Sequence, residues 1–199
     1  EKPLLTDYMS DTHTVIRFDP EKGRYVGYFR GWSRGRRNIA YAETDRFDSW
    51  PTPEAIVIPD VLDYPDTDIY TNAYSPWPDG GDAQLMFPVL YRRVRDTTEL
   101  HMMTSRDGGH LFQRHRQPLI PGDAPRERDG NRSNFMAHGL VRGNAREYFV
   151  YATEGYGYEE TDALPKWKKK SFAPQTRIRR FAFRVDGFVS VRSGPAGGT

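Results

Sequence analysis

The stretch that decides the fold is residues 104–115, which read TSRDGGHLFQRH. It follows the alternating run ELHMM of residues 99–103, and it places two glycines and then Phe112 after Asp107. Glycine supplies the positive φ of a tight turn, so the pattern is typical of two strands joined by a short connection. The same order of strand, turn and strand is found on both sides of it, which indicates a repeat.

Short runs rich in Val, Ile, Tyr and Phe recur along the chain and are separated by Gly, Pro and Asp. No long window shows the 3.6-residue apolar spacing of an amphipathic helix, so the pattern predicts an all-β protein. The runs fall into three groups of four: residues 14–18, 24–30, 38–43 and 54–58; residues 69–74, 84–91, 99–104 and 117–120; and residues 135–141, 147–152, 176–184 and 187–191.

The turns after the third run of each group begin at Asp45, Asp107 and Asp186. They are 62 and 79 residues apart, and an insertion over residues 155–175 accounts for the longer spacing. Repeated four-stranded antiparallel units predict the blades of a β-propeller. Because propellers typically have four to eight blades, we expect one partial domain over residues 1–199, with about three blades of five. The expected blades are residues 11–60, 66–122 and 132–194, and a twelve-stranded β-sandwich is the alternative.

Composition excludes several classes of function. The chain has 199 residues and no cysteine, so it has no disulfide framework and no Cys nucleophile. A net charge of +2 without a basic stripe gives no support for nucleic-acid binding, and no segment reaches the length of a membrane span. The five histidines form no metal-ligand motif, and the Gly-rich turns match no phosphate-binding loop. We therefore expect no metal, no cofactor, no nucleic-acid partner and no membrane association.

Five parts of the chain carry a resemblance to a known family. They are residues 11–32, DTHTVIRFDPEKGRYVGYFRGW; residues 36–51, RRNIAYAETDRFDSWP; residues 68–73, DIYTNA; residues 104–108, TSRDG; and Arg180-Phe181 with residues 186–191, DGFVSV. In this order they resemble uncharacterised five-bladed glycoside-hydrolase-like proteins, which are similar to the arabinofuranosidase/fructosidase propeller superfamily. The resemblance runs over nearly the whole chain.

The resemblance implies a secreted or periplasmic protein that acts on oligo- or polysaccharides and lacks its upstream blades. Such furanosidases place one acidic residue on each of the first three blades, so a chain with only the later blades would not contain the whole set. His13 and Thr14 stand where relatives are expected to have Gln and Asn. The role of the first inner strand is therefore an open point.

In a propeller the first strand of each blade lines the central channel, so its residues are the site candidates. Hydrolysis of a glycosidic bond typically needs two carboxyls. Repeat position selects Asp11 and Asp68, and Glu154 lies among tyrosines and glycines. The alternative for each of these acids is a structural role in a turn, a cap or a loop. The expected substrate-binding residues are His13, Tyr70, Asn72, Asn134 and His138.

Two alternatives to a glycosidase remain open at this point. A propeller that binds carbohydrate, or serves as a scaffold, would have a channel lined by Asn, His and Tyr with one carboxyl. A protein-interaction propeller would carry its polar residues on the outer rim. Fold alone does not separate these functions.

The opening stretch also resembles the Asp-box of sialidase-type propellers, Ser-x-Asp-x-Gly-x-x-Trp, with Phe112 in the place of Trp. The resemblance implies that the Asp107 carboxylate accepts backbone N–H bonds and that Phe112 packs between sheets. We therefore expect a structural turn at the blade rim.

Overall fold

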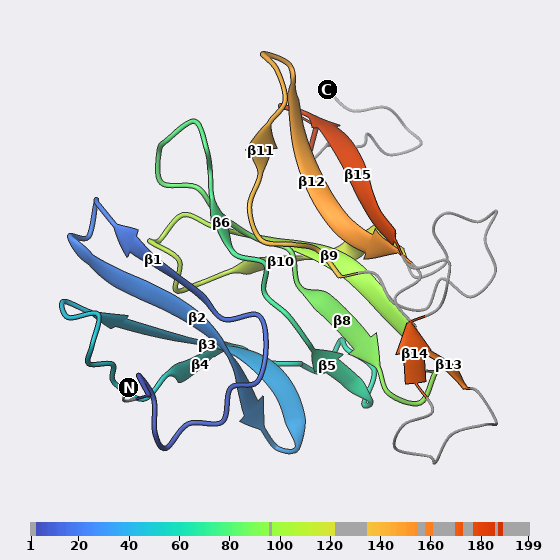
Figure 1. Ribbon diagram of the computed structural model, residues 1–199, viewed down its shortest axis with the longest axis horizontal. Helices are drawn as coiled ribbons and strands as arrows, with labels where there is room; N and C mark the ends of the chain where they lie inside the picture. The colour runs from blue at the N-terminus through green and yellow to red at the C-terminus, as the bar shows by residue number, and fades with distance from the viewer. Residues whose placement is uncertain are drawn as a thin grey trace.

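The computed structural model describes residues 3–95, 97–121, 135–154, 158–160, 170–172, 177–185 and 187–188. Within these residues the chain forms several antiparallel sheets (Figure 1), so the all-β prediction is confirmed. The described part contains no helix that is long and apolar enough to cross a membrane.

Sheet 1 is the four-stranded meander predicted for the first group. It comprises β1 (Val15–Asp19), β2 (Arg24–Ser33), β3 (Arg36–Thr44) and β4 (Glu54–Val57), paired in that order. The first turn forms because the Asp19 carboxylate accepts the N–H of Glu21 at 3.0 Å, and Gly23 adopts a φ of +67°. Local sequence therefore determines this hairpin.

Sheet 2 has the same four-stranded order, but two of its strands are interrupted. It contains β5 (Thr67–Ile69), β6 (Ser75–Pro76), β7 (Gln84–Met86), β8 (Val89–Arg92), β9 (Thr97–Ser105) and β10 (Gln113–Ile120), in the order β5-β8-β9-β7-β6 with β10 also paired to β9. The predicted continuous strands over 69–74 and 84–91 are wrong in this respect. Ala73 has a φ of +41°, which breaks the first, and Pro88, which has no N–H, lies in the break of the second.

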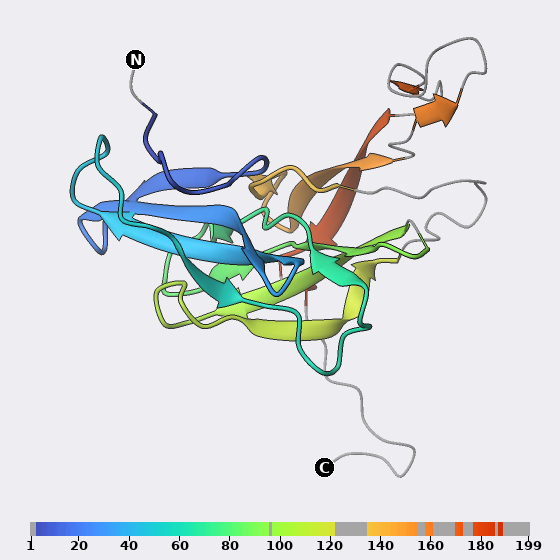
Figure 2. The same ribbon diagram turned by 90° about the horizontal axis from the view of Figure 1, so that it is seen from below.

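Sheet 3 contains β11 (Val141–Arg142), β12 (Glu147–Glu154) and β15 (Arg177–Arg184). The predicted strand over 135–141 is wrong in extent. Met136 makes only an isolated bridge to Ala152, and Gly139 turns the chain with a φ of +98°. Strands β13 (Tyr158–Glu160) and β14 (Lys170–Phe172) pair within the predicted insertion and lie beyond the end of β12 (Figure 2). The last predicted strand, 187–191, falls largely outside the described residues.

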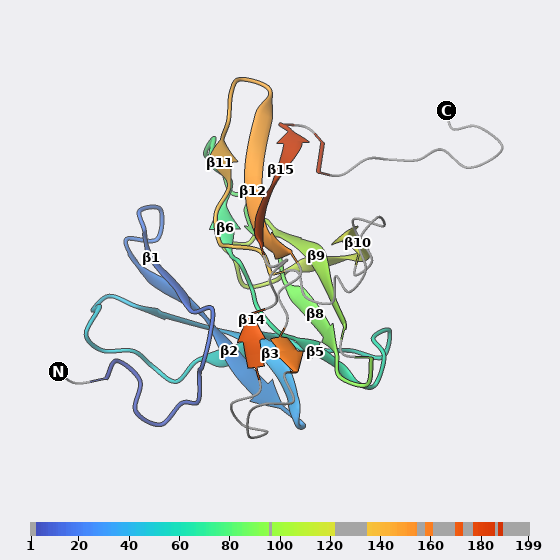
Figure 3. The ribbon, with the colours of Figure 1, turned by 45° about the vertical axis from the view of Figure 1, so that its right-hand side comes forward.

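Sheet 2 is buried on both faces, between sheets 1 and 3 (Figure 3). Its alternating side chains divide between two cores, because successive residues of a strand point to opposite faces. Met86 and Met103 join the first core with sheet 1, while Leu85 and Met102 join the second core with sheet 3. A β-sandwich, the alternative fold, would instead enclose one core between two sheets.

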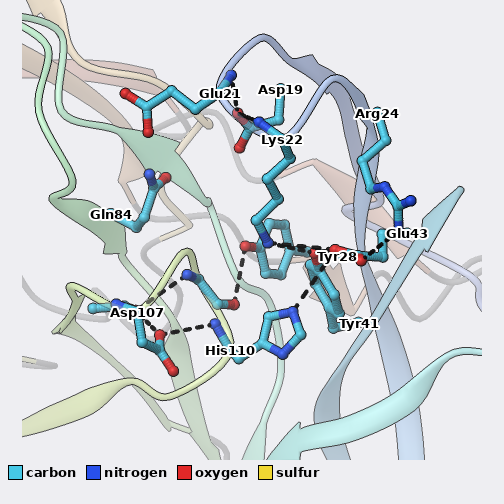
Figure 4. A network of polar contacts seen from close by, with 12 residues as sticks. Asp19, Glu21, Lys22, Arg24, Tyr28, Tyr41, Glu43, Gln84, Asp107 and His110 are labelled. Carbon is cyan, nitrogen blue, oxygen red and sulfur yellow. Dashed lines mark hydrogen bonds and ion pairs between the residues drawn. The ribbon is translucent and has the colours of Figure 1, made fainter. Parts of the chain in front are cut away.

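The turn after β9 docks sheet 2 onto sheet 1 (Figure 4). The Tyr28 hydroxyl donates to the Gly109 carbonyl at 3.1 Å, and its ring stacks on Tyr74 with the centroids 4.0 Å apart. On the other side of the turn, the His110 ring lies 4.4 Å from that of Tyr41. The turn therefore belongs to the interface between two sheets.

The carboxylate of Asp107 organises this turn, as the sequence predicts. It accepts the backbone N–H of His110 at 3.1 Å and that of Leu111 at 2.9 Å, and the Ser105 hydroxyl donates to it at 2.6 Å. Phe112 packs against the first core, also as predicted. Burial alone would raise the pKa of Asp107, but these hydrogen bonds outweigh it and hold the pKa below its usual value.

Candidate functional site

Segments from the three sheets meet at one hollow of about 270 Å³, which we call the three-sheet pocket. Thr12 and His13 precede β1, Tyr70 and Thr71 follow β5, and the third segment pairs with β12. The lining residues are Thr12, His13, Tyr70, Thr71, Phe135, Met136 and Thr153. The structure thus brings together His13 and Tyr70, two of the residues that the sequence assigned to a central channel.

His13 is held on two sides by the segment that follows β5. Its Nδ1 accepts the backbone N–H of Ala73 at 3.2 Å, and its carbonyl accepts the Asn72 Nδ2 donor at 2.8 Å. Burial, with smaller contributions from the nearby His138 and Arg30, lowers the pKa of His13 to about 4. The imidazole is therefore neutral at physiological pH.

The backbone at this contact is strained. His13 has a φ of +52° and Ala73 a φ of +41°, and both lie in the left-handed region. For residues other than glycine this region costs about 1–3 kcal/mol each, and such strain is often concentrated at functional sites. Here it directs the His13 ring and the Ala73 N–H toward each other.

Aromatic rings form another part of the pocket wall. Tyr70 lies 5.6 Å from Phe135 and 5.7 Å from Tyr91, measured between ring centroids. Both rings that line the pocket are half-buried. Rings that pack on one another in this way form a rigid apolar wall beside the polar groups of the pocket.

Arg30 is the buried cation behind this wall, with 3% of its surface exposed. Its Nε and Nη2 both donate to the Tyr70 carbonyl, at 3.0 and 2.7 Å, and its guanidinium carbon lies 4.1 Å from the Tyr70 ring centroid. Its Nη1 donates to Asp11 at 2.6 Å. The predicted catalytic residue Asp11 therefore neutralises Arg30, while most of its carboxylate remains exposed.

Asp68, the second predicted catalytic acid, lies elsewhere, as the fully buried carboxylate of an ion cluster. Arg37 Nη1 donates to one carboxylate oxygen at 2.6 Å, and Arg93 donates to both oxygens, at 2.8 and 2.6 Å. The Arg37 backbone N–H adds a bond at 2.9 Å. Burial favours a raised pKa, but the bonds from Arg93 and Arg37 outweigh it and hold the Asp68 pKa below its usual value. With no exposed surface, this carboxylate is positioned to join sheets 1 and 2.

The other predicted residues are distributed as follows. Asn72 is buried and uses both ends of its amide inside the protein, because its Oδ1 also accepts the Tyr74 N–H. His138 is exposed in an irregular segment and contributes to the lowered pKa of His13. Asn134 and the side chain of Glu154 lie outside what the structure describes. Among the described lining residues none is a carboxylate, and no cluster of described side chains could hold a metal ion.

Arg30 was not predicted from the sequence, and neither were the pocket residues Thr12, Thr71, Phe135, Met136 and Thr153. The signal for Arg30 was present: it lies two residues after Tyr28 and thus on the same, buried face of β2. A charged residue on a buried face needs an ion pair or hydrogen bonds inside the protein, so Arg30 could have been predicted to contact polar groups of another segment.

A second hollow of about 140 Å³ lies between the loop before β5 and strands β8, β9 and β10. Its arginines are already paired: Arg92 with Asp66, and Arg114 with Asp63 at 2.7 Å. Arg116 pairs with both Asp60 and Asp63. These ion pairs fasten the loop to the sheet and neutralise the hollow's cations.

Comparison with protein-family models gave no match, and comparison with curated proteins gave none either. Among solved structures, the chain is similar to a candidate glycoside hydrolase from Bacteroides ovatus, with 15% identity and a TM-score of 0.47 over 83% of this chain and 52% of that one. It is also similar to the fructofuranosidase of Schwanniomyces occidentalis, complexed with fructose and, as a point variant, with fructosylnystose. These two matches have 12% identity and a TM-score of 0.48, over 92% of this chain and 45% of the other.

The chain therefore spans about half the length of the solved structures that it matches. It is structurally similar, at low identity, to glycoside hydrolases and to a fructofuranosidase.

Proposed function

We propose that the chain is part of a carbohydrate-active β-propeller and that the three-sheet pocket binds one neutral sugar ring. Sheets 1, 2 and 3 would then be successive blades, and the pocket would be the described part of the central channel. The observation that carries the proposal is the convergence of His13, Tyr70 and Phe135, from three different sheets, on one hollow.

The chemistry of the lining supports a neutral polyol. Thr12, Thr71 and Thr153 supply hydroxyls, His13 supplies a neutral imidazole, and the aromatic rings can pack on the apolar C–H face of a sugar. The nearest buried cation, Arg30, is neutralised by Asp11. A ligand carboxylate would therefore find no unpaired cation among these described groups.

The size of the pocket supports a single ring. Pockets for drug-sized ligands hold about 300–1,000 Å³. At about 270 Å³ the three-sheet pocket lies just below that range. A monosaccharide, or one terminal residue of a longer chain, fits this volume.

Saturation-transfer NMR tests the proposal, with fructose, arabinose, glucose and galactose as neutral probes and glucuronate as the charged comparator. We expect a signal from at least one neutral sugar, and its loss in Tyr70→Leu, which removes the ring and keeps apolar volume. Tyr64→Leu is the matched control, because Tyr64 is exposed and lies outside the pocket. Equal signals from both variants, or none from the wild type, would contradict sugar binding at this site.

Glycosidic hydrolysis is the second candidate, and the position of Asp11 favours it. Its exposed carboxylate lies one residue before Thr12 and is held in place by Arg30 at 2.6 Å. A retaining or inverting mechanism needs a second carboxyl about 5–9.5 Å from it, and the described lining supplies none. Asp11 would act as base or nucleophile only together with a carboxyl from beyond the described lining.

Release of a chromophore from aryl glycosides tests hydrolysis. We expect Asp11→Asn to lower kcat at least 100-fold if the chain hydrolyses them. Asp48→Asn is the control, because Asp48 is also exposed and paired with an arginine, Arg46, at 3.1 Å. Equal rates in the two variants would remove Asp11 from the mechanism.

A further inference from the structure

We infer that Asn72 and the backbone N–H of Ala73 fix His13 as a hydrogen-bond donor, through Nε2, to an oxygen of the bound ligand. Asn72 is a positioning residue, and His13 is the residue that donates the hydrogen bond to the ligand. The inference rests on the proposed function for its ligand, whereas the state of His13 in the free protein is testable without one.

The tautomer of His13 follows from the chemistry of its partner. A backbone N–H can only donate, so the Nδ1 that accepts from Ala73 at 3.2 Å must present its lone pair. In a neutral imidazole the proton then lies on Nε2. The Nδ1 edge faces Ala73, which leaves Nε2 as the donor that His13 can offer to the three-sheet pocket.

The orientation of Asn72 follows in the same way. The N–H of Tyr74 donates to Oδ1 at 3.0 Å, so this end of the amide is the carbonyl. The other end is therefore Nδ2, which donates to the His13 carbonyl at 2.8 Å. Asn72 is 2% exposed, so neither bond competes with bulk water. The amide thus fixes the His13 backbone against a segment 59 residues away in the sequence.

Burial, with smaller contributions from nearby charged groups, keeps the imidazole neutral. The groups that face His13 are His138, from the segment paired with β12, and Arg30, from β2. Both disfavour a positive charge on His13, and the Asp11 carboxylate is hydrogen-bonded to Arg30. Together with burial, they lower the pKa of His13 to about 4. The Nε2 donor state therefore persists from about pH 5 to pH 8.

A fixed neutral donor has a consequence for ligand choice. Nε2–H can pair with a hydroxyl or ring oxygen, and a deoxy analogue would leave a half-buried donor without a partner. Sites that hydrogen-bond a ligand hydroxyl discriminate strongly against analogues that lack it. We expect the deoxy form of a bound sugar, with the contacting oxygen removed, to lose at least ten-fold in affinity.

The first experiment determines the tautomer and protonation state of the His13 ring by long-range ¹H–¹⁵N NMR in the free protein. We expect the Nε2–H tautomer from pH 6 to 8 and no protonation above about pH 5. In Asn72→Asp, which keeps the acceptor for Tyr74 but lacks the donor to His13, we expect a mixture of tautomers or a raised pKa. Asn38→Ala is the control, since Asn38 is equally buried and its amide donates to Ser33 instead.

Two results would overturn the assignment. One is an Nδ1–H tautomer, or a pKa near 6.5, in the wild type, a measurement that does not depend on any variant folding. The other is an Asn72→Asp spectrum identical to that of the wild type. If the spectra agree with expectation but no sugar binds, the proposed function fails and the positioning role of Asn72 stands.

The second experiment measures binding of the same four neutral sugars to His13→Gln and His13→Asn. The Gln amide reaches the position of Nε2 and can replace the donor, whereas the Asn amide reaches only the position of Nδ1. We expect His13→Gln to stay within about three-fold of the wild-type affinity and His13→Asn to lose at least ten-fold. Equal losses in both variants would contradict a donor role for Nε2.

Discussion

Asp68 shows how burial decides what a carboxylate can do. Its position in the repeat suits a catalytic acid, but its two oxygens are occupied by Arg37 and Arg93 and it has no exposed surface. Asp11 has the opposite surroundings, with one arginine partner and an exposed carboxylate. Sequence identifies both as acids at corresponding places, whereas only the contacts separate a structural ion pair from a group that a ligand can reach.

The substitution Asp68→Asn should destabilise the fold. It leaves two guanidinium groups without their anion, and breaking a buried pair costs about 3–5 kcal/mol. Because Arg93 is 40% exposed, we expect the lower end of this range. Urea unfolding measures the effect, and Asp48→Asn should change the unfolding free energy by about 0.5 kcal/mol or less. Unchanged stability in Asp68→Asn would contradict the structural role.

Among the strands and turns, the sequence predicted the turn that is formed by neighbouring residues and missed the strand break that depends on residues distant in the sequence. The turn of Asp107 was predictable from local sequence. Its carboxylate accepts backbone N–H groups only three and four residues further on, and the two glycines between them adopt the positive φ that the turn requires. The turn after β3 differs from the expected repeat. Thr44 organises it by donating to the Ser49 carbonyl at 2.7 Å, while Asp45 is exposed and pairs with Arg24. The strand break at Ala73 accompanies the hydrogen bond from its N–H to His13, which is distant in the sequence. The residues around Ala73 therefore gave no basis for predicting the break.

Because the turn packs onto sheet 1, we expect Gly109→Ala to lower the stability of the fold strongly. Gly109 has a φ of +88°, and a Cβ there would lie 2.2 Å from the hydroxyl of the buried Tyr28. Gly81 is a matched control, because it has the same φ of +88° and no heavy atom within 4 Å of its Cβ position.

We expect Gly81→Ala to cost about 1–2 kcal/mol, the usual penalty of the left-handed region. Gly109→Ala should cost at least about 1 kcal/mol more, because it also disrupts a buried hydrogen bond. Thermal unfolding compares the two variants. Equal losses of stability in the two variants would contradict the close contact between Gly109 and Tyr28.

At the scale of the whole molecule, the order of strands was predictable and the meeting of the sheets was not. Alternation along β7 and β9 reveals apolar residues on both faces, but not which sheet covers each face. The three-sheet pocket combines residues 12–13, 70–71, 135–136 and 153. Their position in the first strand of each predicted blade selected His13 and Tyr70 as members of such a channel, whereas their contacts with Asn72, Ala73 and Arg30 required the folded chain.

The charged groups of the whole molecule predict that acid destabilises it. Burial tends to raise the pKa of Glu43, but bonds from Tyr41, Arg24 and Lys22 lower it to about 2. The pKa values of Asp68 and Asp63 are also lowered, because their arginine bonds outweigh burial. The unfolded chain binds more protons than the folded one below about pH 4.5, so stability present at neutral pH is lost as the pH falls toward 2.

His13 adds to this loss in a higher pH window. Its folded pKa is about 4, against about 6.5 when unfolded, so stability falls between pH 6.5 and pH 4. Urea unfolding at pH 7, 5 and 3 should show a steady decline. His13→Gln should flatten the upper part of the curve and Glu43→Gln the lower part. Curves parallel to the wild type would contradict the two assignments.

Chemical-shift mapping of the ¹⁵N-labelled chain tests the three-sheet pocket most directly, with fructose, arabinose, glucose and galactose, and with glucuronate for comparison. We expect at least one neutral sugar to shift the amides of residues 12–13, 70–71 and 153 together, with one saturation curve, and glucuronate not to shift them. Shifts confined to one sheet, an equal response to glucuronate, or no response to any neutral sugar would contradict a neutral-sugar site built from three sheets.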